Sequence, residues 1–152
     1  VSQNLGAKEY ERAKKGAKFG ILCSISIAEL IGIVIYAAAP LLISAFNSDP
    51  DVVAYGAAQA RTVTLFYFLL AFSHCIAAIL RGSGKSAIPM VVMLCVWCIL
   101  RVTYITVTVH FIPDIRVVFW AYPLTWSISS AIFLVLFLRG KWVYGFENTT
   151  NA

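Results

Sequence analysis

The chain has 152 residues, of which 61% are hydrophobic and only 12% are charged. A water-soluble domain needs more polar side chains to cover its surface, so this composition excludes an ordinary soluble protein. The net charge of +5 does not indicate nucleic-acid binding, because most of the 12 lysines and arginines lie in short segments between long apolar runs. The cysteines also lie inside apolar runs, as small buried hydrophobic residues rather than disulfide partners or metal ligands: Cys23, Cys75, Cys95 and Cys98.

Four apolar segments follow one another along the chain, at residues 19–46, 52–80, 87–112 and 117–138. Each is long enough to cross a hydrocarbon core of about 30 Å as a helix that rises about 1.5 Å per residue. Helices satisfy their own backbone hydrogen bonds in lipid, and these segments lack the alternating pattern of barrel strands. The sequence therefore predicts an all-α integral membrane protein with four transmembrane helices.

The connections between these segments carry helix-boundary signals. Asp49 is placed to cap the second helix, and Pro50 suits the first turn of that helix. Residues 81–86 read Arg-Gly-Ser-Gly-Lys-Ser and predict a short hairpin, in which the glycines are free to take positive φ and Ser86 caps the third helix. A phosphate-binding loop is excluded there, because the spacing of that motif is absent and no strand precedes it.

Positive charges are distributed unequally over the two ends of the predicted helices. One end holds Lys8, Arg12, Lys14, Lys15, Lys18, Arg81, Lys85, Arg139 and Lys141, whereas the other holds Arg116 together with Asp49, Asp51 and Asp114. Lysines and arginines near the membrane favour the cytoplasmic side. We therefore expect a multi-pass protein of the plasma (inner) membrane with both chain ends in the cytoplasm, residues 143–152 as a cytoplasmic tail, and Trp142 and Tyr144 as interfacial anchors.

Glu29 lies about 16 Å beyond Lys18 along the first predicted helix, close to the middle of the membrane. An ionisable group at that depth is costly unless it faces a partner or a water-filled cavity. Its carboxyl group can exchange a proton during a transport cycle or hold a cation, and it can equally be a protonated group that only links two helices. Both interpretations stay open, and Glu29 is the candidate ion-coupling residue.

Three further polar side chains lie inside the predicted spans. Arg101 is about 15 Å before Phe111 in the third span, where we expect an interior polar contact, and Arg61 is expected to snorkel towards an interface. Either arginine can also pair with Glu29 or with a carboxylate outside this chain. His74 can titrate, but a histidine near hydroxyl groups in a span is more often an interhelical hydrogen-bonding group. The aromatic residues can line a cavity for flat lipophilic cations, although helix packing accounts for most of them.

Residues along nearly the whole chain resemble those of a known family, the multidrug and toxic compound extrusion (MATE) transporters. No single match is specific, and the resemblance rests on an ordered set that fits the predicted topology. The set comprises residues 1–7 and 11–13, Phe46 with Asp49 and Val52, residues 80–84, Trp97 with Arg101, residues 120–126 and residues 139–142.

The resemblance implies a twelve-helix transporter of two lobes that exports drugs or organic cations in exchange for sodium ions or protons. Residues 1–18 then form the end of a preceding transmembrane helix and a basic cytoplasmic link, and residues 19–142 supply helices nine to twelve. The implied partners are membrane lipid, the N-terminal part of the same transporter and a small cationic or amphipathic substrate, with no cofactor besides the coupling ion. The chain departs from the family in two places. Its second span has no acidic residue, and Arg101 is not followed by a proline.

Other functions are compatible with the same observations. A flippase for lipid-linked saccharides has a similar architecture, and cationic residues facing the cavity would favour it. A free-standing four-helix structural or regulatory subunit would use the basic stretch at residues 8–18 to bind anionic lipid. An enzyme ranks last, because no paired carboxylates, nucleophile with a base or metal cluster can be recognised. Val1 stands where a complete chain would begin with methionine, which indicates a piece of a longer protein.

Overall fold

The computed structural model describes residues 1–144, so most of the predicted tail at residues 143–152 lies outside the described residues. The chain is helical throughout, with short turns between the elements. In order these are α1 (Ser2–Gly6), α2 (Tyr10–Ser44), α3 (Pro50–Thr64), α4 (Tyr67–Gly82), α5 (Ala87–Met93), the π-helix η1 (Leu94–Leu100), α6 (Arg101–Phe111) and α7 (Arg116–Leu138).

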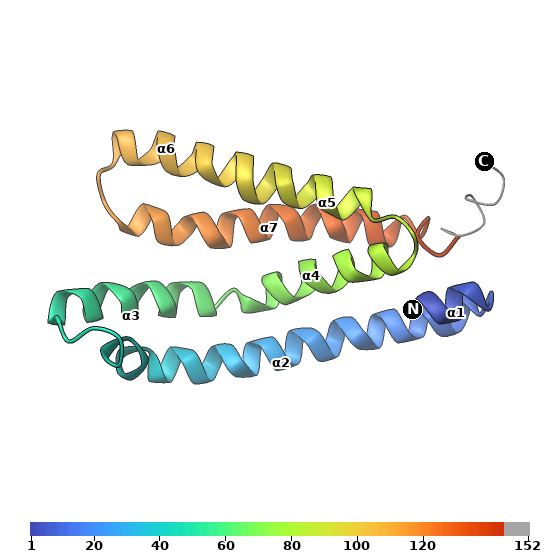
Figure 1. Cartoon of the computed structure of the whole chain (residues 1–152), viewed down its shortest axis with the longest axis horizontal. Coiled ribbons are helices and arrows are strands. Elements are labelled where there is room, and N and C mark those ends of the chain that lie inside the picture. Colours follow the sequence, from blue (N-terminus) through green and yellow to red (C-terminus); the bar gives the residue numbers. More distant parts are fainter. Residues whose placement is uncertain (145–152) are drawn as a thin grey trace.

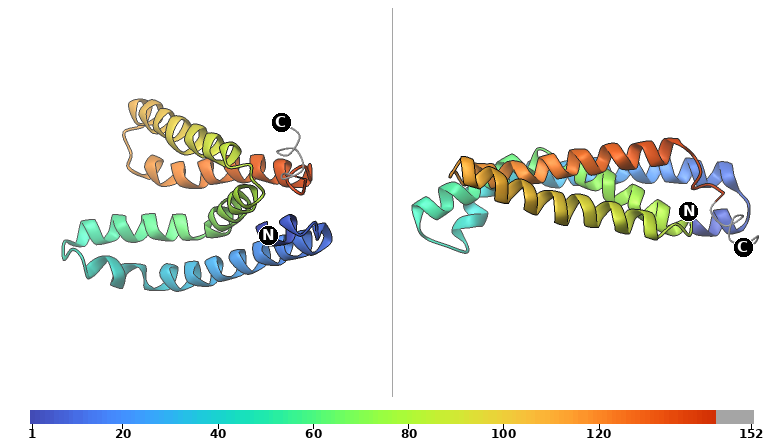
Figure 2. Two further views of the ribbon diagram at one scale, coloured as in Figure 1. Left: turned by 45° about the vertical axis from the view of Figure 1, so that its right-hand side comes forward. Right: turned by 90° about the horizontal axis from the view of Figure 1, so that it is seen from above.

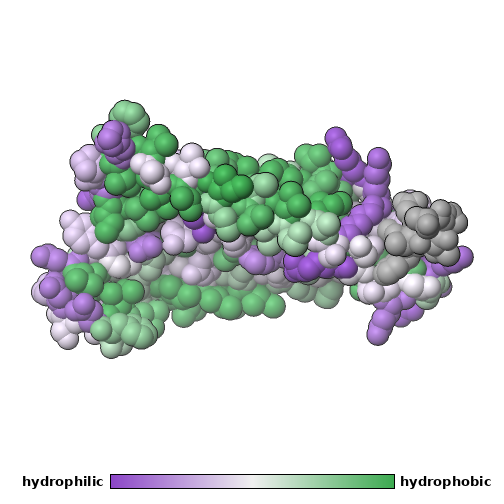
Figure 3. Space-filling model, turned by 45° about the horizontal axis from the view of Figure 1, so that its top comes forward, coloured by the Kyte–Doolittle hydropathy of each residue, from purple (hydrophilic) through white to green (hydrophobic). Residues whose placement is uncertain are grey.

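Four helical passes run between two ends of the molecule (Figures 1 and 2). Helix α2 packs on α3 and α4, these two pack on α7, and α7 packs on η1 and α6. Three helices are long and apolar enough to cross a membrane: α2, the continuous helix Ala87–Phe111 and α7. The bent pair of α3 and α4 provides a fourth span if the two helices together are taken as one crossing. A band of hydrophobic residues lies between two hydrophilic ends (Figure 3). The predicted all-α membrane fold is confirmed.

The first pass extends well beyond the lipid. Helix α2 has 35 residues and is about 52 Å long, whereas the hydrocarbon core is about 30 Å thick. The sequence placed the basic residues in a link before the first span, but the helix begins at Tyr10 and carries all of them except Lys8 in its first turns. The charged turns are therefore a continuation of the same helix beyond the length that one membrane crossing needs.

The second pass is broken in its middle. Helix α3 ends at Thr64, helix α4 begins at Tyr67, and their axes differ in direction by 54°. Leu65, in the break, is exposed, and the backbone N–H groups of Phe66 and Leu69 bond to the carbonyls of Val63 and Phe66, three residues back, instead of following the α-helical pattern. The single helix expected over residues 52–80 is therefore corrected to two helices.

The predicted helix boundaries are confirmed at one turn and partly corrected at another. The Asp49 carboxylate accepts hydrogen bonds from the backbone N–H groups of Asp51 at 2.9 Å and Val52 at 3.4 Å, and so caps α3 as expected. Gly84 has φ of +83° in the hairpin between α4 and α5, which confirms the predicted use of glycine. Ser86 makes no capping hydrogen bond to α5, so its predicted role was wrong.

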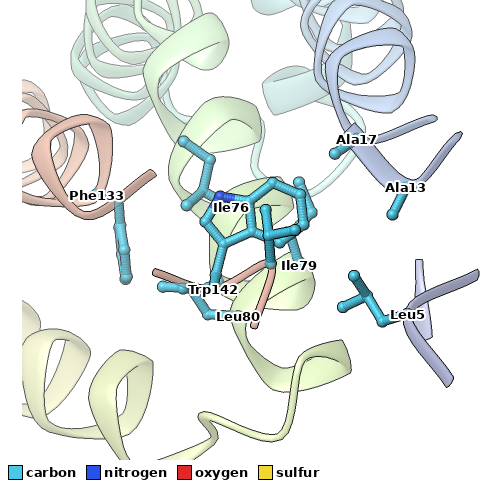
Figure 4. Close-up of a cluster of buried hydrophobic side chains, with 10 residues drawn as sticks. Leu5, Ala13, Ala17, Ile76, Ile79, Leu80, Phe133 and Trp142 are labelled. Carbon is cyan, nitrogen blue, oxygen red and sulfur yellow. The ribbon is translucent and has the colours of Figure 1, made fainter. Parts of the chain in front are cut away.

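The N-terminal segment, the α4–α5 hairpin and the turn after α7 meet at one end of the bundle. The ammonium group of Lys85 donates a hydrogen bond to the carbonyl of Lys141, and the rings of Tyr10 and Tyr144 lie 5.3 Å apart. A cluster of buried side chains fills the space between these segments (Figure 4). Its members are Leu5, Ala13, Ala17, Ile76, Ala77, Ile79, Leu80, Phe133, Trp142 and Val143.

Trp142 was expected to anchor the protein at the lipid interface, but it is only 3% exposed. The chain reverses at Gly140, which has φ of +66°, and this turn folds Trp142 back against the end of α7. Its ring stacks on Phe137 with centroids 5.4 Å apart, and its indole N–H donates to the Phe137 carbonyl at 3.2 Å. Trp142 is thus a core residue, because the glycine turn directs it inward.

Gly32 allows α2 to approach the break in the second pass closely. A Cβ atom at this position would lie 3.0 Å from the carbonyl oxygen of Thr64 and 3.4 Å from the ring of Tyr67. Small residues permit such close helix packing in membranes. Helix α2 therefore rests against the break through a side chain that is only a hydrogen atom.

We expect Gly32→Val to lower the free energy of unfolding by about 1–3 kcal/mol, because the added methyl groups overpack a contact with backbone. The measurement is the thermal midpoint of the complete protein in detergent. Gly16→Val is the matched control, since a Cβ at Gly16 meets no atom within 4 Å. Equal midpoints for the two variants would show that α2 does not depend on this contact.

Candidate functional site

Arg101 is the first residue of α6 and directly follows the π-helix η1. Its guanidinium donates from Nε and Nη2 to the hydroxyl of Thr125 on α7, at 3.2 and 2.6 Å. The same guanidinium lies over the ring of Trp97, 5.4 Å from its centroid, and over the ring of Tyr122 at 4.6 Å. The predicted interior polar contact of Arg101 is thus made by a hydroxyl group and two aromatic rings.

Further aromatic contacts extend this arrangement across three passes. The ring of His74 on α4 meets Trp97 edge-on at 5.1 Å. On α7 the rings of Tyr122 and Trp126 are 6.0 Å apart, and Tyr67 of α4 lies 6.2 Å from Trp126. We call this set the Arg101 cluster, which consists of Tyr67, His74, Trp97, Arg101, Tyr122, Thr125 and Trp126.

Local helix geometry brings these side chains together. Trp97 and Arg101 are four residues apart, a spacing that places side chains on one helix face, and the widened turns of η1 carry both towards α7. π-Helical turns occur frequently at functional sites. On α7 the Thr125 hydroxyl, which is fully buried, lies 2.9 Å from the carbonyl of Ala121 and donates to its own helix. Its lone pairs therefore remain available to Arg101.

The Arg101 cluster has more hydrogen-bond donors than acceptors. The indole Nε1 atoms of Trp97 and Trp126 are buried and have no hydrogen-bond partner within the described chain. Arg101 has no carboxylate partner either, since Lys14–Glu11 is the one ion pair formed among residues 1–144. A guanidinium carries five N–H donors, and an indole carries one. The site can therefore accept a group rich in hydrogen-bond acceptors.

A groove adjoins the cluster on the side of α3. Its volume is about 330 Å³, which is at the lower end of the range for small-molecule sites. Two members of the cluster, Tyr67 and Tyr122, form part of its wall. The other lining residues are Ile43, Gly56, Gln59, Ala60 and Val63.

Glu29 lies outside the Arg101 cluster, near the middle of α2 and one turn before Gly32. Its Oε2 atom is buried and makes no hydrogen bond within the described chain. No ion pair joins it to Arg61 or Arg101 among the described residues, so the expected pairing within this chain is absent.

Arg61 is also separate from the cluster. It is exposed, and its Nε donates to the carbonyl of Tyr36 on α2 at 3.4 Å, while its guanidinium lies 5.6 Å from the centroid of the Tyr36 ring.

The structure thus brings Arg101 and His74 together and leaves Glu29 and Arg61 apart from them. His74 contacts a ring, whereas the hydroxyls of Ser73 and Thr64 bond to carbonyls of their own helices.

Trp97, Tyr122, Thr125 and Trp126 were not among the candidate residues taken from the sequence. Residue spacing was the signal that could have found them. Trp97 and Arg101 are four residues apart and so share one helical face, and the same holds for the set Tyr122, Thr125 and Trp126. Their meeting across two helices could not be read from spacing alone. No group of three or more His, Cys, Asp or Glu within residues 1–144 is arranged to hold a metal ion.

The MatE family model matches residues 1–107. The chain is 28% identical over 143 residues to Multidrug and toxin extrusion protein 1 of Xenopus tropicalis, an alignment that covers 91% of this chain and 24% of that protein. It is also 28% identical over 134 residues to the probable multidrug resistance protein NorM of Thermotoga maritima, covering 81% of this chain and 27% of that protein. The chain thus spans about a quarter of the length of these curated relatives. No solved structure gives a significant match.

Proposed function

Because this chain belongs to the MatE family of membrane transporters, whose members are drug and cation antiporters rather than enzymes, we propose that it is part of a secondary antiporter. The complete protein exports drugs or organic cations in exchange for sodium ions or protons. This chain supplies helices nine to twelve of a twelve-helix, two-lobe molecule. Export then proceeds by alternating access, as two lobes move about a central cavity.

The observation that carries this proposal is the break in the second pass. Leu65 lies about 22 Å after Pro50 and about 25 Å before Gly82 along the two helices, so the break is deep in the membrane. Non-helical backbone at that depth is tolerated only where it is buried in protein or lines a water-filled cavity. The exposed break at Leu65 therefore supports a position that faces a cavity or another part of the transporter. Transporters commonly build their binding sites at such discontinuous helices.

Glu29 is the proposed ion-coupling residue. It lies deep in α2, and its buried Oε2 atom has no partner among the described residues. An intramembrane carboxyl group without a protein partner is stable when it is protonated or bound to a cation. Such a group can alternate between the two states as the protein changes conformation, which is the requirement for coupling to a proton or a sodium ion.

The membrane orientation is proposed from charge. The N-terminal segment, the α4–α5 hairpin and the turn after α7 lie at one end of the molecule (Figure 1), and most of the lysines and arginines that flank the spans belong to these segments. Under the positive-inside rule this end is cytoplasmic. The turns that contain Asp49 and Asp114 then face the outside of the plasma membrane, or of the inner membrane in a bacterium.

The test is transport by the complete protein that contains this chain, purified and reconstituted in lipid vesicles. With ethidium as the probe, we expect ethidium to move in the direction opposite to an imposed sodium or proton gradient, and the movement to stop when that gradient is collapsed. Vesicles without protein are the control. If folded protein moves no ethidium under either gradient, the antiporter proposal is wrong.

A further inference from the structure

We propose that the Arg101 cluster binds an oxyanion, a carboxylate or a phosphate, that the transported substrate carries. This inference rests on the proposed transport function and narrows its substrate class. The substrate is then an amphipathic molecule with an acidic group in addition to a cationic group.

The first argument is the excess of donors. Nε and Nη2 of Arg101 share one acceptor, the Thr125 hydroxyl. The indole N–H groups of Trp97 and Trp126 are buried and lack an acceptor within residues 1–144. Trp126 is only 5% exposed, so solvent does not readily satisfy its N–H. Buried donors in proteins are normally paired, and an oxyanion supplies several acceptor lone pairs at once.

The second argument is charge. The guanidinium of Arg101 is permanently charged, and it already occupies the faces of Trp97 and Tyr122. The rings that the sequence suggested for binding lipophilic cations are thus taken up by a cation of the protein. A second cation at this place would be repelled, whereas an anion would be attracted.

The third argument is depth. Arg101 is about 20 Å from Ala87 and about 15 Å from Phe111 along its helix, near the centre of a hydrocarbon core of about 30 Å. Lipid phosphates lie at the membrane surfaces, so they are not its partner. Two sources of an oxyanion remain, a substrate and a carboxylate on a part of the transporter outside this chain.

The adjoining groove favours the substrate as the source. Tyr67 and Tyr122 belong to both the Arg101 cluster and the groove wall. The groove has a volume of about 330 Å³ and is otherwise lined mainly by apolar or small residues, which suits the apolar body of a small molecule. A substrate can therefore place its body in the groove and its acidic group beside Arg101.

The experiment uses a matched pair of dyes, rhodamine B, which carries a free carboxylate, and its methyl ester, which does not. Binding of each dye to the complete protein in lipid nanodiscs is measured by fluorescence anisotropy. We expect the wild-type protein to bind the acid about tenfold more tightly than the ester, the size expected of a charge-assisted hydrogen bond. In Arg101→Gln this preference should disappear.

Arg61→Gln is the matched control, because it removes another intramembrane guanidinium that stacks on an aromatic ring outside the cluster, and it should keep the preference. Should Arg101→Gln fail to fold, Trp97→Phe is the second variant, because it keeps a ring beside Arg101 but removes one hydrogen-bond donor. The Trp97→Phe protein should then prefer the acid over the ester by a smaller factor than the wild type. A wild-type protein without preference, or an Arg101→Gln protein that retains it, would overturn the proposal and assign the donors to a carboxylate elsewhere in the transporter. A preference in binding without gradient-driven movement of either dye would leave the oxyanion-binding site standing and refute the transport function.

Discussion

Glu29→Gln in the complete protein is expected to reduce gradient-driven export by about tenfold or more, a loss within the range of coupling free energies between two sites. Glutamine has nearly the same shape as glutamate, but it cannot release a proton or balance the charge of a sodium ion. The buried Oε2 atom of Glu29 has no partner within the described chain, so no ion pair is broken by the change. Initial rates of ethidium movement at several proton and sodium concentrations would measure the effect.

Glu11→Gln provides the control for this experiment. Glu11 lies in the exposed first turn of α2 and forms an ion pair with Lys14 at 2.8 Å, and such a surface pair contributes little to stability. Its export rate should equal that of the wild type. If Glu29→Gln also exports at the wild-type rate over the whole range of proton and sodium concentrations, Glu29 is a packing residue and the coupling site lies elsewhere.

Trp142→Ala is expected to have the largest effect on stability, a loss of about 3–5 kcal/mol, as for other large buried aromatic side chains replaced by alanine. The substitution removes the stack on Phe137 and the bond from the indole N–H to its carbonyl. It also leaves a cavity in the buried cluster that contains Ile76, Ile79 and Leu80 (Figure 4). Denaturant or thermal unfolding of the complete protein in detergent would measure the change.

Trp142→Phe separates the two contributions. Phenylalanine keeps a ring at this position and loses the hydrogen bond, so a loss of about 1 kcal/mol is expected. A Trp142→Ala protein as stable as the wild type would mean that the turn at Gly140 does not hold this end of the bundle together.

The sequence was sufficient to predict the helical passes, the cap at Asp49 and the hairpin glycine. These features follow from local rules, because long apolar runs form helices in lipid and a side-chain oxygen satisfies the first N–H groups of a helix. The break at Leu65 was not predictable in this way. Kinks usually occur at proline or glycine, yet Pro40 and Pro123 lie inside continuous helices, whereas the break contains neither residue type.

The candidate site was predicted only in part. Arg101 and His74 stood out because charged or titratable groups are costly in lipid. The indole donors did not stand out, since a tryptophan in an apolar run looks like packing until its N–H is found to lack an acceptor. That property depends on the π-helical turns of η1 and on the register between α6 and α7, which are set by tertiary packing rather than by residue spacing.

The cluster around Trp142 makes the two ends of the bundle unequal in stiffness. At its end, side chains from α1, α2, α4, α7 and the final turn interlock, and the chain crosses directly from α4 to α5 through a short hairpin. At the opposite end, α2 is joined to α3 and α6 to α7 by loops whose side chains are exposed. Regions with few buried contacts open at the lowest free energy. We therefore expect thermal fluctuations of this segment to be largest near the Asp49 and Asp114 turns, with the break at Leu65 as the point about which α3 moves relative to α4.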